Sequence, residues 1–339
     1  MKKLSLQNSS YKYLEQSFRE WLDVLGYAPS TVYNMPNLIR ELFYYLEQRS
    51  VTNIKELDIH HIESYYQKLK ERSNQRRGGG LSAAHLNKHI QALRKFIQYL
   101  RKVGRLQIPE INLENEETET KLTYLTGEEI KELFAAIPKA TSTKNKSIET
   151  VQAIQARDRA MLAIFYGCGL RRNEGVSLDV GDINFDRSIL HVRKGKNYKE
   201  RLVPISKTNL KHLTEYIYDH RPELTKGSKT EALFIGYTNA KRMQGQSLTI
   251  RLRVLQYHTE NIELQEKEIG LHMLRHSIAT HFLQAGMKLE SISRFLGHSS
   301  LESTQIYTHL AGIPIERVQP FDNIKNHDRI QLSEDERGL

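Results

Sequence analysis

The sequence predicts a mainly α-helical protein with a small β-sheet, an α+β chain of two domains. Apolar residues recur every three or four positions through most of residues 1–108, which indicates a helical bundle. The later part mixes such stretches with two short β-type runs, 189–192 and 202–205, on either side of a basic turn. A polar, acidic segment over 109–122 separates the two patterns and is expected to be a linker.

Four helices are expected in the first domain. Their apolar stretches begin near Tyr13, Pro29, Ile59 and Leu86. The fourth helix has the most regular apolar stripe, which consists of Leu86, Ile90, Leu93, Ile97 and Leu100. Lys88, Lys95 and Lys102 recur every seven residues and lie about 200° around the helix from Leu86. One face is therefore expected to pack on the bundle while the other carries positive charge.

The second domain is expected to be mixed. Thr126 and Glu129 form a capping box that opens a helix. A polar loop is expected over 139–149, then a hydrophobic helix from roughly Asp158 to Tyr166. The two β-type runs follow. Later helices are expected over 209–219, 248–257, 272–284, 289–296 and 301–309, and the chain then turns polar as a tail over 311–339.

Composition limits the class of protein. Hydrophobic residues make up 39% of the chain, enough for a substantial core, and no apolar run approaches the roughly 20 residues of a membrane span. The first residues turn polar before a signal-peptide core forms. The single cysteine, Cys168, excludes an internal disulfide framework and a cysteine-built zinc site, and we expect it to be buried and inert. A soluble, cytoplasmic protein without a membrane partner is expected.

Positive charge is concentrated between Arg72 and Arg105. This stretch contains nine basic residues and no acidic one, and the whole chain has a formal net charge of +10. An ordinary solvated helix face is the alternative interpretation, but such surfaces normally mix both signs. The pattern favours a polyanion such as DNA, whose counterions are released on binding. The candidate DNA-binding residues are Arg76, Arg77, Lys88, Arg94, Lys95 and Lys102.

Four short motifs in the second domain carry the candidate chemistry. They are Gly169-Leu170-Arg171-Arg172-Asn173-Glu174, then Lys194-Gly195-Lys196 ahead of Arg201-Leu202-Val203-Pro204, then His272-Met273-Leu274-Arg275-His276, and last Leu296-Gly297-His298 with Tyr307 nine positions beyond. Each is weak alone, because an arginine before a helix or a lysine in a turn is usually a surface charge. Their joint occurrence in this order is much harder to reach by chance.

Together the motifs resemble those of the tyrosine recombinases, most closely the Xer and phage-type integrase branch. The resemblance covers about residues 12 to 310 and is almost continuous over 272–309. It implies a helical, SAM-like core-binding domain over 1–108 and a tyrosine recombinase catalytic domain over 123–310. The basic turn departs from the family's usual Gly-Lys-Gly, so Lys194 and Lys199 stay open as substitutes for Lys196. Arg172 directly follows Arg171, so the two arginines could be confused. The Gly-Leu-Arg match favours Arg171 as the catalytic arginine.

The resemblance implies a site-specific recombinase that cleaves and rejoins DNA through a 3′-phosphotyrosine. The implied catalytic residues are Tyr307, Arg171, Lys196, His272, Arg275 and His298. In this scheme Tyr307 is the nucleophile, the two arginines clamp the phosphate and His298 adds a hydrogen bond. Lys196 protonates the leaving 5′-oxygen and His272 is the base or proton shuttle for Tyr307. Glu174 holds an arginine, and no ATP, metal or other cofactor is required.

The implied partners are double-stranded DNA with a specific recombination site and further copies of the chain, as a tetramer on two sites. The tail over 311–339 is expected to dock into the next subunit through its few apolar residues, Ile313, Ile315, Val318 and Phe321. The expected role is integration and excision of a mobile element. Alternatives are Xer-type chromosome dimer resolution and, less favoured, a type IB topoisomerase.

Two rival interpretations come from other classes. A metal enzyme would use His272, His276 and His281, but Arg275 lies among them and repels a cation. A DNA-binding protein with a dead site is disfavoured by the complete set of catalytic residue types. Otherwise His276, His281 and His309 are expected to pack or to contact the DNA backbone.

Overall fold

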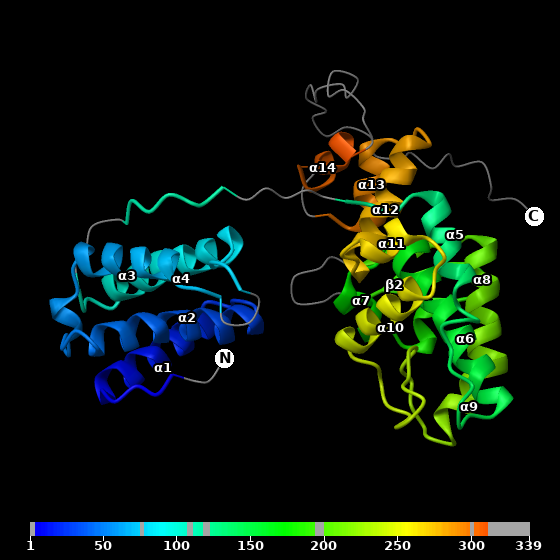
Figure 1. Ribbon diagram of the computed structural model, residues 1–339, viewed down its shortest axis with the longest axis horizontal. Helices are drawn as coiled ribbons and strands as arrows, with labels where there is room; N and C mark the ends of the chain where they lie inside the picture. The colour runs from blue at the N-terminus through cyan, green and yellow to red at the C-terminus, as the bar shows by residue number, and fades with distance from the viewer. Residues whose placement is uncertain are drawn as a thin grey trace, which may run out of the picture. The chain divides into compact units, whose positions relative to one another are not determined.

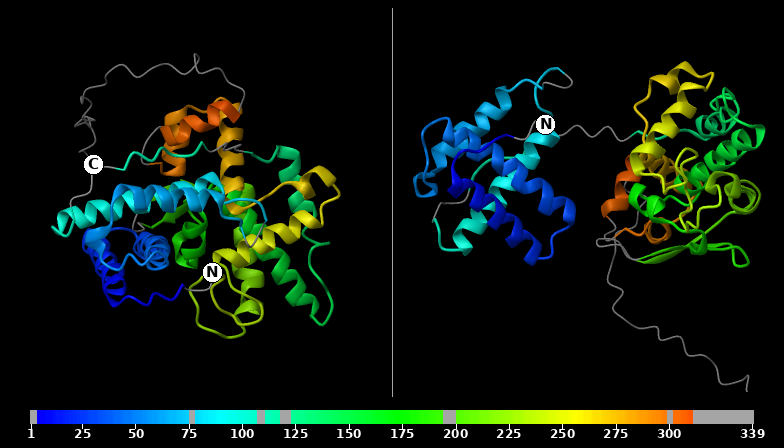
Figure 2. Two further views of the ribbon diagram at one scale, coloured as in Figure 1. Left: turned by 60° about the vertical axis from the view of Figure 1, so that its left-hand side comes forward. Right: turned by 90° about the horizontal axis from the view of Figure 1, so that it is seen from below.

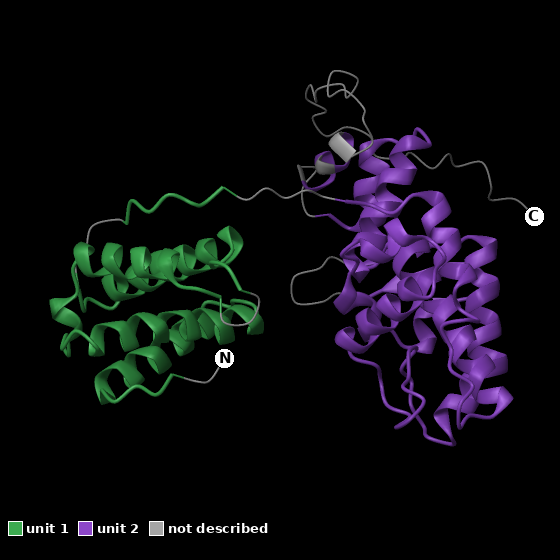
Figure 3. Ribbon diagram, viewed as in Figure 1, with its two compact units in different colours: residues 1–121 green, residues 122–339 purple. Residues whose placement is uncertain are grey.

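A computed structural model describes residues 4–74, 78–106, 111–117, 123–193, 200–298 and 302–310. Within them the chain is mainly helical with one three-stranded antiparallel sheet, so the predicted fold class is confirmed (Figure 1). The chain divides into two compact units, residues 1–121 and 122–339 (Figure 3). Among the described residues, none of the helices is both long and apolar enough to span a bilayer.

The first unit contains the four expected helices. They are α1 (Ser9–Val24), α2 (Pro29–Glu47), α3 (Ile59–Glu71) and α4 (Ala83–Lys102). The side chains of Asn8, Asp58 and Ser82 cap α1, α3 and α4 by accepting backbone N–H groups that have no partner within the helix. Helix α2 packs against the other three. Its Phe43 stacks on Tyr11 of α1 with ring centroids 4.7 Å apart.

Helix α4 is amphipathic as predicted. All five residues of its apolar stripe are buried in the first unit's core. Lys88 and Lys102 are exposed, whereas Lys95 is half-buried with its ammonium 5.2 Å from the centroid of the Tyr27 ring. The burial of the stripe fixes which face of α4 remains available to a partner.

Residues 111–117, inside the expected linker, pack against the first unit. Ile111 is buried in the core. The side chain of Asn87 binds both backbone groups of Glu116, at 2.9 and 2.7 Å. The Glu116 carboxylate accepts from Tyr66 Oη at 2.8 Å and pairs with Lys70 at 2.9 Å. Glu116 of this segment therefore offsets part of the positive charge on α3.

The second unit combines helices with the small sheet. Its elements are α5 (Gly127–Ala135), α6 (Ile148–Leu162), α7 (Arg172–Ser177), β1 (Ile183–Asn184), β2 (Ile189–Val192), β3 (Arg201–Pro204), α8 (Lys207–Thr214), α9 (Arg221–Thr225), α10 (Gly245–Tyr257), α11 (Ile262–Glu266), α12 (Leu271–Gln284), α13 (Leu289–Leu296) and α14 (Glu302–Leu310). The predicted capping box is present at α5, with Thr126 and Glu129 each binding the other's backbone N–H. In the sheet, β2 pairs with both neighbours, and Leu190 lies opposite Val203.

Helix α6 begins ten residues earlier than the predicted start at Asp158. The Ser147 side chain caps it by accepting the Thr150 N–H. Its sequence gave a weak helical pattern because the helix buries charged residues as well as apolar ones. Asp158 is fully buried and pairs with Arg251 of α10. A π-helical stretch, Ala163–Gly167, continues α6 toward the Gly169 turn.

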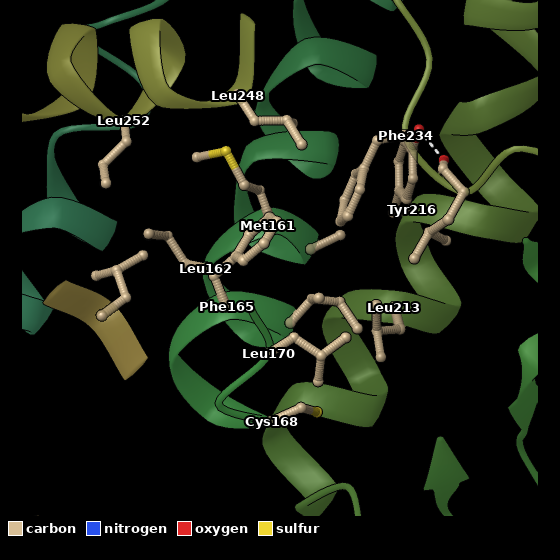
Figure 4. Close-up of a cluster of buried hydrophobic side chains, with 14 of the residues drawn as sticks. Met161, Leu162, Phe165, Cys168, Leu170, Leu213, Tyr216, Phe234, Leu248 and Leu252 are labelled. Carbon is tan, nitrogen blue, oxygen red and sulfur yellow. Dashed lines mark hydrogen bonds between the residues drawn. The ribbon is translucent and has the colours of Figure 1, made fainter. Parts of the chain in front are cut away.

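The main core of the second unit surrounds α6 and its π-helical end. Figure 4 shows Phe165 and Leu170 among side chains from α6, α8 and the segments beyond, with Cys168 at the same cluster. Burial raises the pKa of the Cys168 thiol to about 12, so the thiol stays protonated and unreactive. A separate, smaller core lies where α12, α13 and α14 pack together (Figure 2), and it includes Tyr307.

Candidate active site

Arg171 stands at the start of α7, directly after the turn at Gly169. That turn requires the left-handed backbone that Gly169 adopts, with φ +62°. The Glu174 carboxylate accepts the Arg171 backbone N–H at 2.8 Å and its Nη1 at 3.1 Å. Arg171 Nη2 also donates to the Gly297 carbonyl at 3.2 Å. The first turn of α7 and the end of α13 therefore fix one guanidinium between them.

Arg275 is held more deeply, in the second turn of α12. Only 3% of its surface is exposed. Its guanidinium donates to the Gly169 carbonyl at 2.7 Å and to the Leu296 carbonyl at 2.8 Å. Burial, followed by the charge of Arg171, lowers the pKa of Arg275 to about 10. Arg275 therefore remains a cation at neutral pH.

Tyr307 lies in α14 and is almost fully buried, at 1% exposed. Its Oη is 3.1 Å from Nδ1 of His276. Its ring lies nearly parallel to that of His298, with centroids 6.1 Å apart. Burial raises the pKa of Tyr307, and the charges of Arg275 and Arg171 only partly oppose this. The phenol is therefore protonated at neutral pH in this arrangement.

The two histidines beside Tyr307 are neutral at neutral pH. Burial and then the charge of Arg275 lower the pKa of His298 to about 3. Burial and then His272 lower the pKa of His276 to about 4. Nδ1 of His298 is 2.7 Å from Oγ1 of the buried Thr304 in α14. This contact ties the residue after α13 to the helix that carries Tyr307.

His272, the expected base or proton shuttle for Tyr307, lies on α12 together with His276. It is exposed, one helical turn before His276 on α12. Loss of surrounding water, then the charges of Arg275, Arg172 and Arg171, lower the pKa of His272. In the described part of the chain, the histidine within hydrogen-bond distance of Tyr307 Oη is His276. The four-residue spacing of the two histidines was the available signal for His276, but in the sequence it was considered only for a metal site and not for a contact with Tyr307.

Two further side chains complete the cluster. The guanidinium of Arg201, at the start of β3, donates to both Glu174 carboxylate oxygens at 2.9 Å. Sequence reasoning had used Arg201 only as a marker for counting back to the basic turn. Burial acts to raise the pKa of Glu174, but hydrogen bonding and charge from Arg201, then from Arg171, outweigh it and lower the pKa. Glu174 is therefore a carboxylate set among guanidiniums.

Several expected site residues lie outside the described residues. These are Lys196 with its alternatives Lys194 and Lys199, and Arg76 and Arg77. Two of the three histidines of the metal-enzyme rival have separate surroundings, since His276 meets Tyr307 whereas His281 meets Tyr166 Oη at 2.9 Å. Across the ranges that the structure describes, no three His, Cys, Asp or Glu side chains are grouped to hold a metal ion.

A mainly helical fold that sets guanidiniums around a buried tyrosine defines a class of enzyme suited to holding a phosphate against a tyrosine hydroxyl. Comparison with known proteins agrees. The model of the phage integrase family matches residues 123–312. The tyrosine recombinase XerD of Staphylococcus epidermidis is 34% identical over 279 residues, which cover 81% of this chain and 85% of the relative. The tyrosine recombinase XerC of Pelotomaculum thermopropionicum is 34% identical, over 70% of this chain and 74% of its own.

Solved structures show the same fold. The XerH recombinase bound to its difH substrate aligns with a TM-score of 0.64 at 23% identity, over 89% of this chain and 83% of that one. The Tn1549 transposon integrase in complex with circular intermediate DNA also aligns at 0.64, with 18% identity, over 87% of this chain and 94% of that one. The chain belongs to the phage integrase family and is a tyrosine recombinase. It is an enzyme of site-specific DNA recombination, which cleaves and rejoins DNA strands.

Proposed function

We propose that Tyr307 attacks the scissile phosphodiester, forming a 3′-phosphotyrosyl bond and releasing a DNA 5′-hydroxyl. Attack by the 5′-hydroxyl of another strand then releases Tyr307 and completes the exchange. One phosphodiester is exchanged for another at each step, so the reaction needs no ATP and no metal cofactor. The observation that carries this assignment is the burial of Tyr307 in contact with His276 and beside Arg275 and Arg171, whose charges act on its pKa.

The arginines supply the electrostatic part of the reaction. Attack on a phosphodiester builds negative charge on the non-bridging oxygens, and planar guanidiniums offer paired donors to such oxygens. We assign this role to Arg171 and Arg275, with a hydrogen bond from His298. Because burial keeps the Tyr307 phenol protonated, the proton must leave as the phenol attacks. His276 is in contact with Tyr307 Oη and so joins His272 as a candidate acceptor.

The direct test asks which DNA end, the 3′-phosphate or the 5′-phosphate, becomes covalently attached to the protein. A suicide substrate with a nick near the scissile phosphate traps the covalent complex on a denaturing gel. If Tyr307 holds the 3′-phosphate, a polynucleotide kinase labels the free 5′-hydroxyl of the released strand without prior phosphatase treatment. Release of a 5′-phosphate, or attachment through another residue found by peptide mapping, contradicts the proposal.

A basic groove in the first unit supports a DNA-binding role for that unit. The groove has a volume of about 1160 Å³, and its charged lining includes four cations, Lys12, Arg19, Arg40 and Lys88, against two carboxylates, Glu15 and Glu41. Glu15 is already paired with Arg19 and Arg40, and Glu41 with Arg72. Of the candidate DNA-binding residues, Lys88 lines this groove. Arg94 instead donates to the Leu113 carbonyl, while Lys102 is exposed. We propose that phosphates bind along this face.

Lys196 is proposed as the general acid that protonates the leaving 5′-oxygen. We expect Lys196→Ala to slow cleavage by about 10²- to 10⁴-fold, the usual contribution of such a group. A substrate with sulfur at the 5′-bridging position should restore the rate, because a thiolate leaves without a proton. A larger defect from Lys194→Ala or Lys199→Ala, or no rescue by sulfur, would assign the acid elsewhere.

Strand exchange between two duplexes is proposed to use a tetramer on two DNA sites, with the tail over 311–339 docking into the neighbouring subunit. Truncation after Gly312 should leave binding to one site nearly intact and weaken the assembly of two sites. Gel shift on one site and recombination on a two-site plasmid measure the two effects. Recombination at the full rate by the truncated protein would contradict a role for the tail in assembly.

The biological role is proposed from the sequence and the relatives together. The sequence favours integration and excision of a mobile element, within the cytoplasm. The relatives named XerC and XerD weakly favour the alternative, Xer-type resolution of chromosome dimers. Inverted repeats or cargo genes beside the coding region would favour the mobile element. A recombination site near the terminus of chromosome replication would favour the alternative.

A further inference from the structure

The C-terminal end of α13 binds three arginines through three successive backbone carbonyls. Phe295 accepts from Arg201 Nε at 3.0 Å. Leu296 and Gly297 accept from Arg275 and Arg171, at 2.8 and 3.2 Å. The last carbonyls of a helix lack intrahelical partners and carry its partial negative charge. This helix end is therefore a binding platform for guanidiniums.

Arg201 differs from the other two arginines in what it holds. Both of its terminal nitrogens donate to Glu174, and its side chain is only 7% exposed. Its three contacts are thus a bidentate carboxylate and a carbonyl, all within the protein. Arg171 and Arg275 have the phosphate assigned to them, whereas each of the three nitrogens of Arg201 already donates to Glu174 or to α13.

Glu174, which Arg201 holds, also contacts Arg171 and approaches Arg275. The same carboxylate accepts the backbone N–H and Nη1 of Arg171, and Oε2 is 3.9 Å from Arg275 Nη1. A carboxylate fixed by a paired guanidinium has one orientation, and that orientation sets where Arg171 can lie. Without Arg201, Glu174 would be free to turn toward Arg171 or Arg275 and draw them away from a phosphate.

Gly297 leaves the space that Arg201 occupies. A Cβ at this position would lie 2.8 Å from Arg201 Cδ and 3.0 Å from its Nε and Nη1. Gly297 also has the left-handed backbone, φ +66°, that ends α13. A glycine at the end of α13 therefore allows the Arg201 guanidinium to approach the backbone closely, directly before His298.

We propose that Arg201 is a positioning residue for the phosphate-binding arginines. It locks Glu174 against α7 and fastens the start of β3 to the end of α13, so that Arg171 and Arg275 are held ready for the phosphate. The inference rests on the proposed function, in which those two arginines bind the scissile phosphate. It assigns Arg201 no contact with DNA.

The test compares Arg201→Lys and Arg201→Met with a matched control, Arg251→Lys. Arg251 makes the same kinds of contact, with the fully buried Asp158 carboxylate and the Ala140 carbonyl, and none of these contacts involves the arginine cluster. Single-turnover cleavage of a suicide substrate is measured alongside thermal unfolding and affinity for one site. We expect the Arg201 variants to cleave about 10²-fold more slowly, the effect of a small misplacement of catalytic groups. We expect the control to unfold at a lower temperature while cleaving at nearly the full rate.

A methylphosphonate at the scissile position separates a positioning role from a structural one. In this substrate a methyl group replaces one non-bridging oxygen and the linkage is neutral, so its cleavage depends less on the arginine clamp. We expect the defect of the Arg201 variants to shrink severalfold on this substrate, as it should for Arg171→Ala. An equal defect on both substrates would overturn the inference, as would rescue of the Arg201 variants by a 5′-bridging sulfur, which would assign Arg201 to the leaving group.

The same two substrates distinguish an error in the role of Arg201 from an error in the proposed phosphate clamp. If Arg171→Ala also shows the same defect on both substrates, the phosphate clamp itself is wrong. If Arg171→Ala is rescued and the Arg201 variants are not, only the role of Arg201 is wrong. Should Arg201→Met not fold, Arg201→Lys keeps a cation beside Glu174 and carries the comparison, because lysine lacks the paired planar donors.

Discussion

A Tyr307→Phe variant is expected to fold and to bind its DNA site without ever becoming covalently attached. The substitution removes one buried hydroxyl and leaves the ring, which packs in the small core of α12, α13 and α14. The contacts of Oη with His276 and Arg275 are lost, while the packing of the ring is kept. Because that atom is the proposed nucleophile, we expect a complete loss of cleavage rather than a graded one.

The measurement is a denaturing gel after incubation with a suicide substrate. The matched control is Tyr166→Phe, which removes a hydroxyl in contact with another histidine of α12, His281. This control should give the covalent band at nearly the full rate. A covalent band from Tyr307→Phe would remove Tyr307 from the mechanism.

Local sequence patterns predicted much of the fold. The apolar stripe of α4 and the capping box at Thr126 depend on residues within one or two helical turns, and both occur as expected. The start of α6 was missed because Arg157 and Asp158 are buried inside the protein and interrupt the apolar pattern. The packing of residues 111–117 was missed because it depends on side chains of α3 and α4, far away in the sequence.

The residues of the candidate site also fall into two groups, those that the sequence predicted and those that it did not. Motif spacing singled out Arg171, Arg275, His298 and Tyr307, and the structure brings these residues together around the end of α13 and α14. Spacing gave no indication of Arg201, whose partners Glu174 and Phe295 lie 27 and 94 positions away in the sequence. It also did not distinguish His276 from His272. The two histidines share one face of α12, so the distinction depends on which turn of that face meets Tyr307, and the packing of α14 on α12 determines it.

The arrangement makes charge balance in the site depend on one residue. Arg171, Arg201 and Arg275 lie close together, and each would repel the others without a counter-charge. Glu174, with 3% of its side chain exposed, is the carboxylate that pairs with Arg171 and Arg201 and approaches Arg275. Carbonyl dipoles at the end of α13 add partial negative charge but no full counter-charge. Binding of a DNA phosphate would supply a second anion.

A Glu174→Gln variant is therefore expected to lose both stability and cleavage. Removing one partner of a buried ion pair costs about 3–5 kcal/mol, because the remaining guanidiniums are left uncompensated. The matched control is Asp158→Asn, which removes another fully buried carboxylate paired with arginine. We expect both variants to lower the free energy of unfolding by a similar amount. Only Glu174→Gln should also slow cleavage when the two are compared at equal folded fraction.

The contribution of Glu174 to the free energy of unfolding is expected to depend on pH in a definite direction. The folded-state pKa of Glu174 lies below its ordinary value of 4.5. Its stabilising contribution is therefore fully present above pH 4.5 and is lost as the pH falls through the folded-state pKa. Urea unfolding of the wild type and of Glu174→Gln should differ most near neutral pH and converge as the solution is acidified below pH 4.5. A constant difference between the two across that range, or full cleavage activity in Glu174→Gln, would show that the carboxylate charge does not hold the arginines in place.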